Sequence, residues 1–224
     1  MSSPLFRYKE TTLMLPPVLC GSIGYYALMA CHRNVVVDGF CRYDKRRKIM
    51  HRFDIADVNG RLTLTVPIVK PHKSRATWND VAISTHGQWW NIHKVALWSA
   101  YGRTPFFEYY IDEFMPFLQN PNNDNSSLME FNKGIDRVIR RIARIESNVE
   151  YLSDDIDNSI NIEKISKIKD CRFSDFALSK SIEYYQVRAR QHGFISNLSI
   201  LDLIFNMGPE TPLVLKKIID ENYY

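Results

Sequence analysis

Residues 11–40 read TTLMLPPVLCGSIGYYALMACHRNVVVDGF, and the order of strand and helix patterns in this stretch decides the fold. Residues 11–15 form a short β-type run that a pair of prolines stops, residues 25–31 are typical of a short helix, and residues 35–37 of a buried strand. A strand, a loop, a helix and a second strand within about 28 residues have the size of a βαβ unit. The stretch therefore predicts two parallel strands of an α/β sheet.

The ends of these two strands are where a ligand is expected. Ligands of open parallel sheets tend to lie beyond the carboxyl ends of the strands, which here are residues 16–23 and 38–40. At the second strand end, Asp38 either accepts a hydrogen bond from a substrate hydroxyl or makes a turn with Gly39. The glycines of the first loop match neither GxGxxG nor a P-loop, so we expect no nucleotide cofactor.

Downstream, the sequence indicates a β-hairpin. Residues 52–57 and 62–68 read as two strands joined through Asn59-Gly60, a strong hairpin turn signal. Apolar and hydroxyl residues alternate in LTLTV, which predicts that one face of the hairpin is buried. Residues 80–84 have the composition of one further short strand.

Periodicity marks two helices in the middle of the chain. Trp90, His93, Leu97 and Tyr101 are three or four residues apart and share one helical face. A capping box begins a second helix; its two residues are Ser127 and Glu130, and its apolar positions are Leu128, Phe131, Ile135, Val138, Ile142, Ile145 and Val149. We expect that helix to cover a sheet or core. The arginines of this helix lie outside its apolar face and are expected to be solvated. They are Arg137, Arg140, Arg141 and Arg144.

The chain as a whole is expected to be one α/β domain over residues 1–224, with a mixed β-sheet flanked by helices and a helical C-terminal half. With 224 residues and 45% hydrophobic content, it is long and apolar enough for a packed core. Residues 153–169 predict a loop that leads into a β-type segment. Four cysteines without CxxC spacing indicate free thiols, and prolines and glycines interrupt the longest early apolar run before it could span a membrane. We therefore expect a cytoplasmic protein without a transmembrane segment.

Positive charge is concentrated in residues 42–52, which read RYDKRRKIMHR. Six Arg or Lys against one Asp give a local charge of +5, whereas the whole chain carries +4, so the remaining residues sum to −1. A concentrated positive site needs an anionic partner, and Arg and Lys bind phosphates through charge-assisted hydrogen bonds. The alternative is a solvated loop. Nucleic acid is not expected, because no positive excess exists elsewhere to neutralise a run of phosphates.

The same stretch carries a family resemblance. YDKRRKIMHRFDI (residues 43–55) and NGRLTLTVPI (residues 59–68) resemble the central signature of WbqC-like proteins. Trp90, His93 and Tyr101 with PFFEYY (residues 105–110) resemble the next block. YYQVR (residues 184–188) and HGFISNLSILDLIFNMG (residues 192–208) resemble the C-terminal block of members from Bacteroides-type bacteria. The sequence departs from the family where many members have Asn-Arg and this chain has His51-Arg52.

The resemblance implies a bacterial protein associated with surface polysaccharides such as O-antigen or capsule. Substrates in such pathways are nucleotide-sugars, lipid-pyrophosphate-linked sugars and activated acyl or amino-acid groups, most of which carry phosphates. We therefore expect a transferase-type enzyme that acts on a phosphate-bearing activated sugar by acyl, aminoacyl, glycosyl or nucleotidyl transfer. The alternative is a non-catalytic accessory that binds a glycan-assembly enzyme or a lipid-linked intermediate, with peripheral association to that machinery.

The expected site residues follow from the charge, the patterns and the family blocks. Lys45, Arg46 and Arg52 are expected to hold the substrate phosphates, with Tyr43 packed beside them. His51 and His93 are the acid–base candidates, because cations beside His51 favour its neutral imidazole. Two further binding candidates are Asp38 and Tyr101. The six histidines are scattered without HxxxH or HxH spacing, so no metal site is expected, and Cys20 has no base paired with it in sequence.

Overall fold

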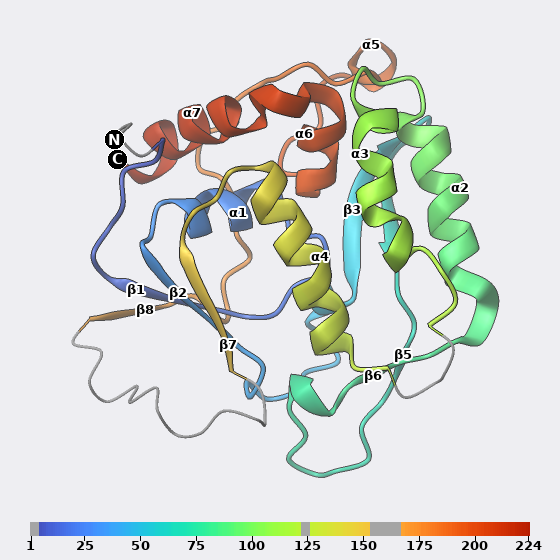
Figure 1. Cartoon of the computed structure of the whole chain (residues 1–224), viewed down its shortest axis with the longest axis vertical. Coiled ribbons are helices and arrows are strands. Elements are labelled where there is room, and N and C mark those ends of the chain that lie inside the picture. The colour runs from blue at the N-terminus through green and yellow to red at the C-terminus, as the bar shows by residue number, and fades with distance from the viewer. Residues whose placement is uncertain (1–4, 122–125, 153–166) are drawn as a thin grey trace.

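A parallel sheet of four strands forms one half of the computed structural model, which describes residues 5–121, 126–152 and 167–224 (Figure 1). The strands lie in the order β7-β2-β1-β8, and every neighbouring pair is parallel. Their bounds are β1 Thr12–Leu15, β2 Asn34–Asp38, β7 Asn148–Leu152 and β8 Ile168–Asp170. Helix α1 (Ile23–Ala30) joins β1 to β2, which confirms the predicted βαβ unit.

The residues of this unit explain its position in the core. All four residues of β1 are buried, as expected for a central strand whose two faces are both covered. Ser22 caps α1, because its hydroxyl oxygen accepts a hydrogen bond from the Tyr25 backbone N–H at 3.3 Å. All eight residues of α1 are buried, and the helix contacts α6 and α7.

The order of the strands reverses at β1. The chain places β2 and then β7 on one side of β1, and it places β8 on the other side. In an open parallel sheet the crevice beyond the carboxyl ends of two such strands is the usual ligand site. Here those two strands are β1 and β8.

The predicted hairpin is confirmed as a separate antiparallel sheet. It consists of β3 (Arg52–Asp57) and β4 (Gly60–Thr65), and Gly60 has the left-handed backbone (φ +103°) that the turn requires. Its apolar face is formed by Phe53, Ile55 and Leu64, all buried, as the alternation predicted. A second short antiparallel pair, β5 (Ile68–Val69) and β6 (Ala82–Ile83), confirms the further strand expected in residues 80–84.

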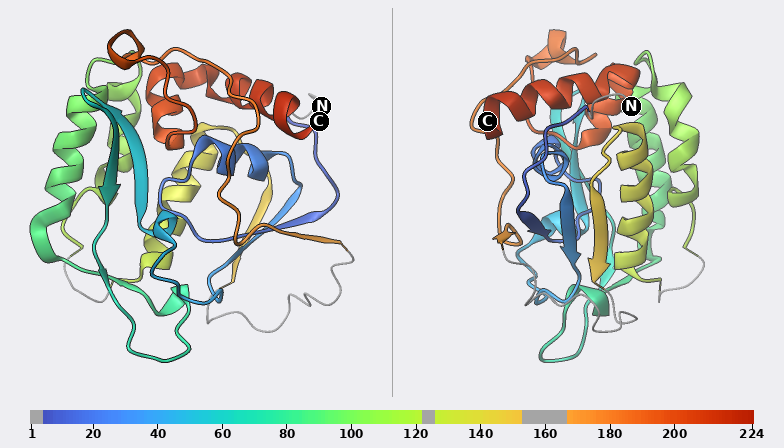
Figure 2. Two further views of the ribbon diagram at one scale, coloured as in Figure 1. Left: turned by 180° about the vertical axis from the view of Figure 1, so that it is seen from behind. Right: turned by 60° about the vertical axis from the view of Figure 1, so that its left-hand side comes forward.

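Helices surround the sheets. Their bounds are α2 Trp89–Tyr101, α3 Phe107–Phe114, α4 Leu128–Ile142, α5 Ala189–His192, α6 Ile200–Met207 and α7 Thr211–Tyr223. Figure 1 shows α2 and α3 side by side, with the hairpin between them and the parallel sheet, and α7 along the upper edge. Figure 2 shows α4 on one face of the molecule and the segment that follows β8 on the opposite face. The predicted α/β fold with a helical C-terminal region is confirmed, although parallel and antiparallel strands occupy separate sheets.

Helix α4 ends earlier than its apolar spacing predicted. The capping hydrogen bond from the Glu130 N–H to the Ser127 hydroxyl is present at 3.3 Å, which confirms the predicted start. The predicted continuation to Val149 is wrong, because Arg144 adopts a left-handed backbone (φ +52°) after the helix end and Val149 lies in β7 beside β2. The expectation that Arg140 is solvated is also wrong. Its side chain is 17% exposed and donates to the buried Asp136 carboxylate at 2.6 Å.

The segment before β1 lies against the end of α7, because the Lys9 Nζ donates to the Tyr223 carbonyl oxygen at 2.8 Å. The buried apolar residues of the sheets and helices form one core cluster. Residues 153–166 of the predicted loop lie outside the described residues, and the predicted β-type segment after them is confirmed as β8. None of the described helices has the length and apolar character that crossing a membrane requires.

Candidate functional site

A pocket of about 420 Å³ lies beyond the carboxyl ends of β1 and β8, where the strand order reverses. It is lined by Val18, Leu19, Cys20, Gly21, Ser22, Tyr25, Lys48, Ile49, Arg52, Phe53, Asp54, Arg61, Thr63, Asp175, Phe176, Asn197 and Ser199. The loop after β1 forms one wall, the hairpin another, and the segment after β8 the third. The predicted ligand position at residues 16–23 therefore coincides with the pocket.

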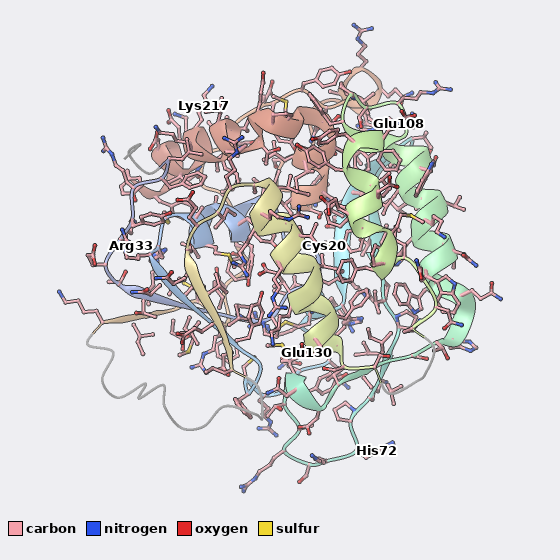
Figure 3. All side chains as sticks on the ribbon, in the orientation of Figure 1. Cys20, Arg33, His72, Glu108, Glu130 and Lys217 are labelled. Carbon is pink, nitrogen blue, oxygen red and sulfur yellow. The ribbon has the colours of Figure 1, made fainter. Side chains whose placement is uncertain are left out.

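Unusual backbone geometry is concentrated in the pocket wall. Among the described non-glycine residues, five have a positive φ, and three of these line the pocket: Cys20 (φ 43°), Phe176 (φ 56°) and Asn197 (φ 52°). A left-handed backbone is unfavourable for most residues with a Cβ, and such residues are enriched at functional sites. Figure 3 labels Cys20 near the centre of the molecule.

Two helices begin at the pocket, and their first turns are bonded to each other. Ser22 precedes α1, and Ser199 precedes α6. The Ile23 N–H donates to the Leu198 carbonyl oxygen, and the Ile200 N–H donates to the Gly21 carbonyl oxygen, both at 2.9 Å. The first N–H groups of both helices are therefore already bonded within the protein, and the helix dipoles alone favour an anionic ligand here.

The segment after β8 is held against α1 by Asn197. The Gly24 N–H donates to the Asn197 Oδ1 at 2.8 Å, and the Asn197 amide donates to the Phe176 carbonyl oxygen at 3.0 Å. A Cβ at position 24 would overlap that carbonyl oxygen, so the close approach requires a glycine. These contacts fix the wall that Asp175 and Phe176 contribute.

The polar face of the hairpin forms the opposite wall. Asp54 is opposite Thr63 in the register, and its carboxylate accepts from the Thr63 hydroxyl at 2.6 Å and from Arg61 at 2.9 Å. Arg61 also donates to the Ser196 carbonyl oxygen at 2.8 Å, which joins the hairpin to the third wall. The charge of Arg61 is therefore already balanced within the pocket.

The pocket lining holds three cations and the carboxylates of Asp54 and Asp175, a net charge of +1. Two of the cations, Arg52 and Lys48, have no ion-pair partner among the residues that the structure describes. The Arg52 Nε is buried and has no hydrogen-bond partner among those residues. Arg52 is half-buried, Lys48 is exposed, and both line the pocket, so the two side chains are suited to charge-assisted hydrogen bonds with an anionic group.

The sequence of the chain matches one protein family. The family model described as the WbqC-like protein family matches residues 17–173, more than half of the chain. The chain belongs to the WbqC-like protein family. No curated protein and no solved structure matches it. The region matched to the WbqC-like family contains the first two walls of the pocket, whereas Asp175, Phe176, Asn197 and Ser199 follow it.

Three residues that we expected to bind phosphate in this WbqC-like protein lie outside the pocket. Arg46 is 85% exposed and pairs with Asp44 at 3.3 Å, and Lys45 is also exposed. The Tyr43 ring packs edge-on against the buried Trp78, with 4.9 Å between the ring centres. Of the four expected phosphate ligands, only Arg52 lines the pocket.

His51 is buried and does not line the pocket. Its Nδ1 lies 3.1 Å from the Val66 carbonyl oxygen, which can only accept a hydrogen bond, so the neutral ring carries its proton on Nδ1. Burial lowers the pKa of His51, and the charges of Arg52 and Lys48 lower it further against the effect of that hydrogen bond. The neutral imidazole that we predicted is therefore favoured, mainly by burial.

His93 and Tyr101 lie in the interior, on the face of α2 that the spacing predicted. The His93 Nε2 donates to the Thr65 carbonyl oxygen at 3.0 Å, and burial lowers the pKa of His93 to about 4. His93 lines a small apolar cavity that shares Leu19, Cys20 and Phe53 with the polar pocket. The Tyr101 hydroxyl donates to the buried Asp202 carboxylate at 2.9 Å and accepts from the Ala56 N–H at 3.2 Å.

Asp38 forms structural bonds outside the pocket. Its carboxylate accepts from the Phe40 N–H at 2.9 Å and from Arg172 at 2.6 Å. The turn that was the alternative interpretation of Asp38 is thus present. Burial raises the pKa of the Cys20 thiol well above its usual range, so little of the nucleophilic thiolate exists at neutral pH.

Sequence reasoning missed several pocket residues. Lys48 was part of the basic stretch, yet only the short helical turn Lys48–Met50 directs it into the pocket. Asp54 and Arg61 were visible as the polar side of the hairpin alternation. Asn197 and Asp175 gave no local signal, because they lie in a long irregular segment that reaches the pocket through tertiary contacts. Among the described residues, no group of His, Cys, Asp and Glu is suited to hold a metal ion.

Proposed function

We propose that this protein is a transferase-type enzyme of bacterial surface polysaccharide biosynthesis that acts in the cytoplasm on a phosphate-bearing activated sugar. Membership of the WbqC-like family supports the polysaccharide pathway. The pocket supports the substrate class, because its volume of about 420 Å³ is in the range typical of small-molecule sites.

The single observation that carries the proposal is that two cations, Arg52 and Lys48, line the pocket and form no ion pair with any described residue. Arg offers a planar pair of donors to phosphate oxygens, and Lys adds a point charge. The N-termini of α1 and α6 face the same space and add backbone polarity of the same sign. A phosphate or pyrophosphate group is therefore the kind of ligand that this charge favours.

The other side of the pocket suits the sugar. The Asp54 carboxylate and the Thr63 hydroxyl oxygen on the hairpin offer acceptors for sugar hydroxyl groups, and the Ser22 hydroxyl at the start of α1 offers a donor. His51 and His93 stay predictions as acid–base residues, since neither ring lines this pocket. Asp38 and Tyr101 stay predictions as further binding residues.

A second candidate function is a non-catalytic accessory that binds a glycan-assembly enzyme or a lipid-linked intermediate. The observation that favours it is a surface beside the pocket where the exposed Phe40 and Phe173 lie next to the basic loop. Exposed apolar residues on a charged surface are typical of an interaction site.

The test is a thermal-shift screen of nucleotide-sugars and acyl donors on three proteins. These are wild type, the double variant Lys48→Ala/Arg52→Ala, and the matched control Lys45→Ala/Arg46→Ala. Both double variants remove two positive charges, but only the first removes them from the pocket. We expect a nucleotide-sugar that raises the melting temperature of wild type and of the control but not that of the pocket variant.

Equal stabilisation of all three proteins would contradict the phosphate site. Loss in the control with retention in the pocket variant would place phosphate binding on the exposed loop instead. An accessory would bind the ligand without turning it over, which product analysis by mass spectrometry distinguishes from an enzyme.

A further inference from the structure

A basic and aromatic surface adjoins the pocket but contributes no side chain to its lining. We define the rim patch as residues 40–47 together with Phe173. Residues 40–47 contain four Lys or Arg and one Asp, a net charge of +3. Phe40 is 45% exposed, and Phe173 is 70% exposed.

The two parts of the rim patch are held together by named contacts. The Arg47 guanidinium lies over the Phe173 ring, 5.0 Å from the ring centre. Asp38 accepts from the Phe40 N–H and from the side chain of Arg172, so one buried carboxylate links the backbone of Phe40 to the residue that precedes Phe173. The exposure of Phe40 and Phe173 is therefore built into a fixed surface.

The rim patch is continuous with the pocket along both segments. Lys48 and Ile49 line the pocket directly after Arg47, and Asp175 and Phe176 line it two residues after Phe173. An extended external surface that contacts the rim patch would also lie next to the pocket. A ligand attached to that surface could enter the pocket while it remains attached.

We infer that the rim patch docks this protein on an anionic membrane surface and presents the pocket to a phosphate-bearing sugar that is anchored in the lipid. Clustered Lys and Arg are attracted by the negative potential of such a surface, and exposed aromatic rings insert at the depth of the headgroups. Membrane docking follows from the rim patch alone. The lipid-anchored substrate rests, in addition, on the proposed function.

The experiment measures co-sedimentation of the full chain with vesicles of phosphatidylcholine alone or mixed with phosphatidylglycerol. Wild type binds the anionic vesicles and not the neutral ones, and raised salt weakens the binding. Lys45→Glu/Arg46→Glu lowers the partition coefficient by about tenfold or more. Phe173→Ser also lowers it, although it changes no charge.

Two variants serve as matched controls. Lys216→Glu/Lys217→Glu reverses two exposed lysines on α7, where Figure 3 labels Lys217, and Tyr109→Ser removes a 75% exposed ring from α3. Both are expected to bind like wild type. Because all the substituted side chains are exposed, each variant is expected to keep the melting temperature of wild type.

The inference is overturned if anionic vesicles do not bind the protein, or if the α7 double variant weakens binding as much as the loop variant. It is also overturned if inorganic pyrophosphate displaces the protein and Phe173→Ser binds normally, because the patch would then take soluble phosphate. The rim variants retain Lys48 and Arg52, so their thermal shift with a nucleotide-sugar reports separately on the proposed function.

Discussion

His93 makes the stability of this protein depend on pH in a defined window. Its ring is 3% exposed, and burial lowers its pKa from 6.5 to about 4. Between these two values the unfolded chain binds more protons than the folded protein, so stability falls as the pH decreases from the upper value towards the lower one. From about pH 7 to about pH 5, the two pKa values predict a loss of about 2 kcal/mol through His93 alone.

The measurement compares the free energy of unfolding by urea at the two pH values for wild type and His93→Phe. The variant keeps a ring against Phe53 and Trp89, which contact His93 edge-on, but removes the titrating group. Its loss on acidification should be smaller than that of wild type by about 2 kcal/mol, whatever its stability at neutral pH. His72→Gln, at the exposed loop labelled in Figure 3, is the control and should match wild type. Equal losses in wild type and His93→Phe would refute the reasoning.

Three further predictions concern the pocket wall and the interior behind it. Gly24→Ala forces the Phe176 carbonyl away from α1 and should lower the free energy of unfolding in urea by about 1–3 kcal/mol. An unchanged midpoint would show that the segment containing Phe176 moves away from α1 without cost. Tyr101→Phe leaves the Asp202 carboxylate and the Ala56 N–H each one partner short and should cost about 1–3 kcal/mol, so a variant as stable as wild type would argue against this network. Cys20 should resist maleimide at neutral pH until the protein unfolds, and rapid labelling seen by mass spectrometry in the folded protein would contradict its burial.

Local patterns predicted the elements that local interactions specify. The hairpin through Asn59-Gly60 and the capped start of α4 depend on residues close together in the chain, and the βαβ unit was visible as a succession of short local patterns, although its strands pair across 22 residues. The end of α4 was not predictable in this way. Its apolar spacing continues to Val149, and only pairing with β2 makes that residue part of a strand.

The candidate site was predicted in kind but only partly in its residues. The charge excess identified Arg52, and the strand ends identified the loop after β1. Charge counts do not give side-chain direction, so Lys45 and Arg46 were expected where Lys48 and Arg61 are found. The third wall comes from residues 175–199, a segment with little regular structure whose position depends on contacts such as Asn197 with Gly24.

The central claim is that Arg52 binds the phosphate of the substrate inside the pocket. The most direct measurement follows the arginine Nε–H signals by NMR during titration with pyrophosphate. The buried Arg52 Nε has no partner among the described residues, whereas the exposed Arg46 Nε already contacts Asp44. Our account predicts a saturable shift of the Arg52 signal and an unchanged Arg46 signal. A shift of Arg46 with no response from Arg52 would contradict it.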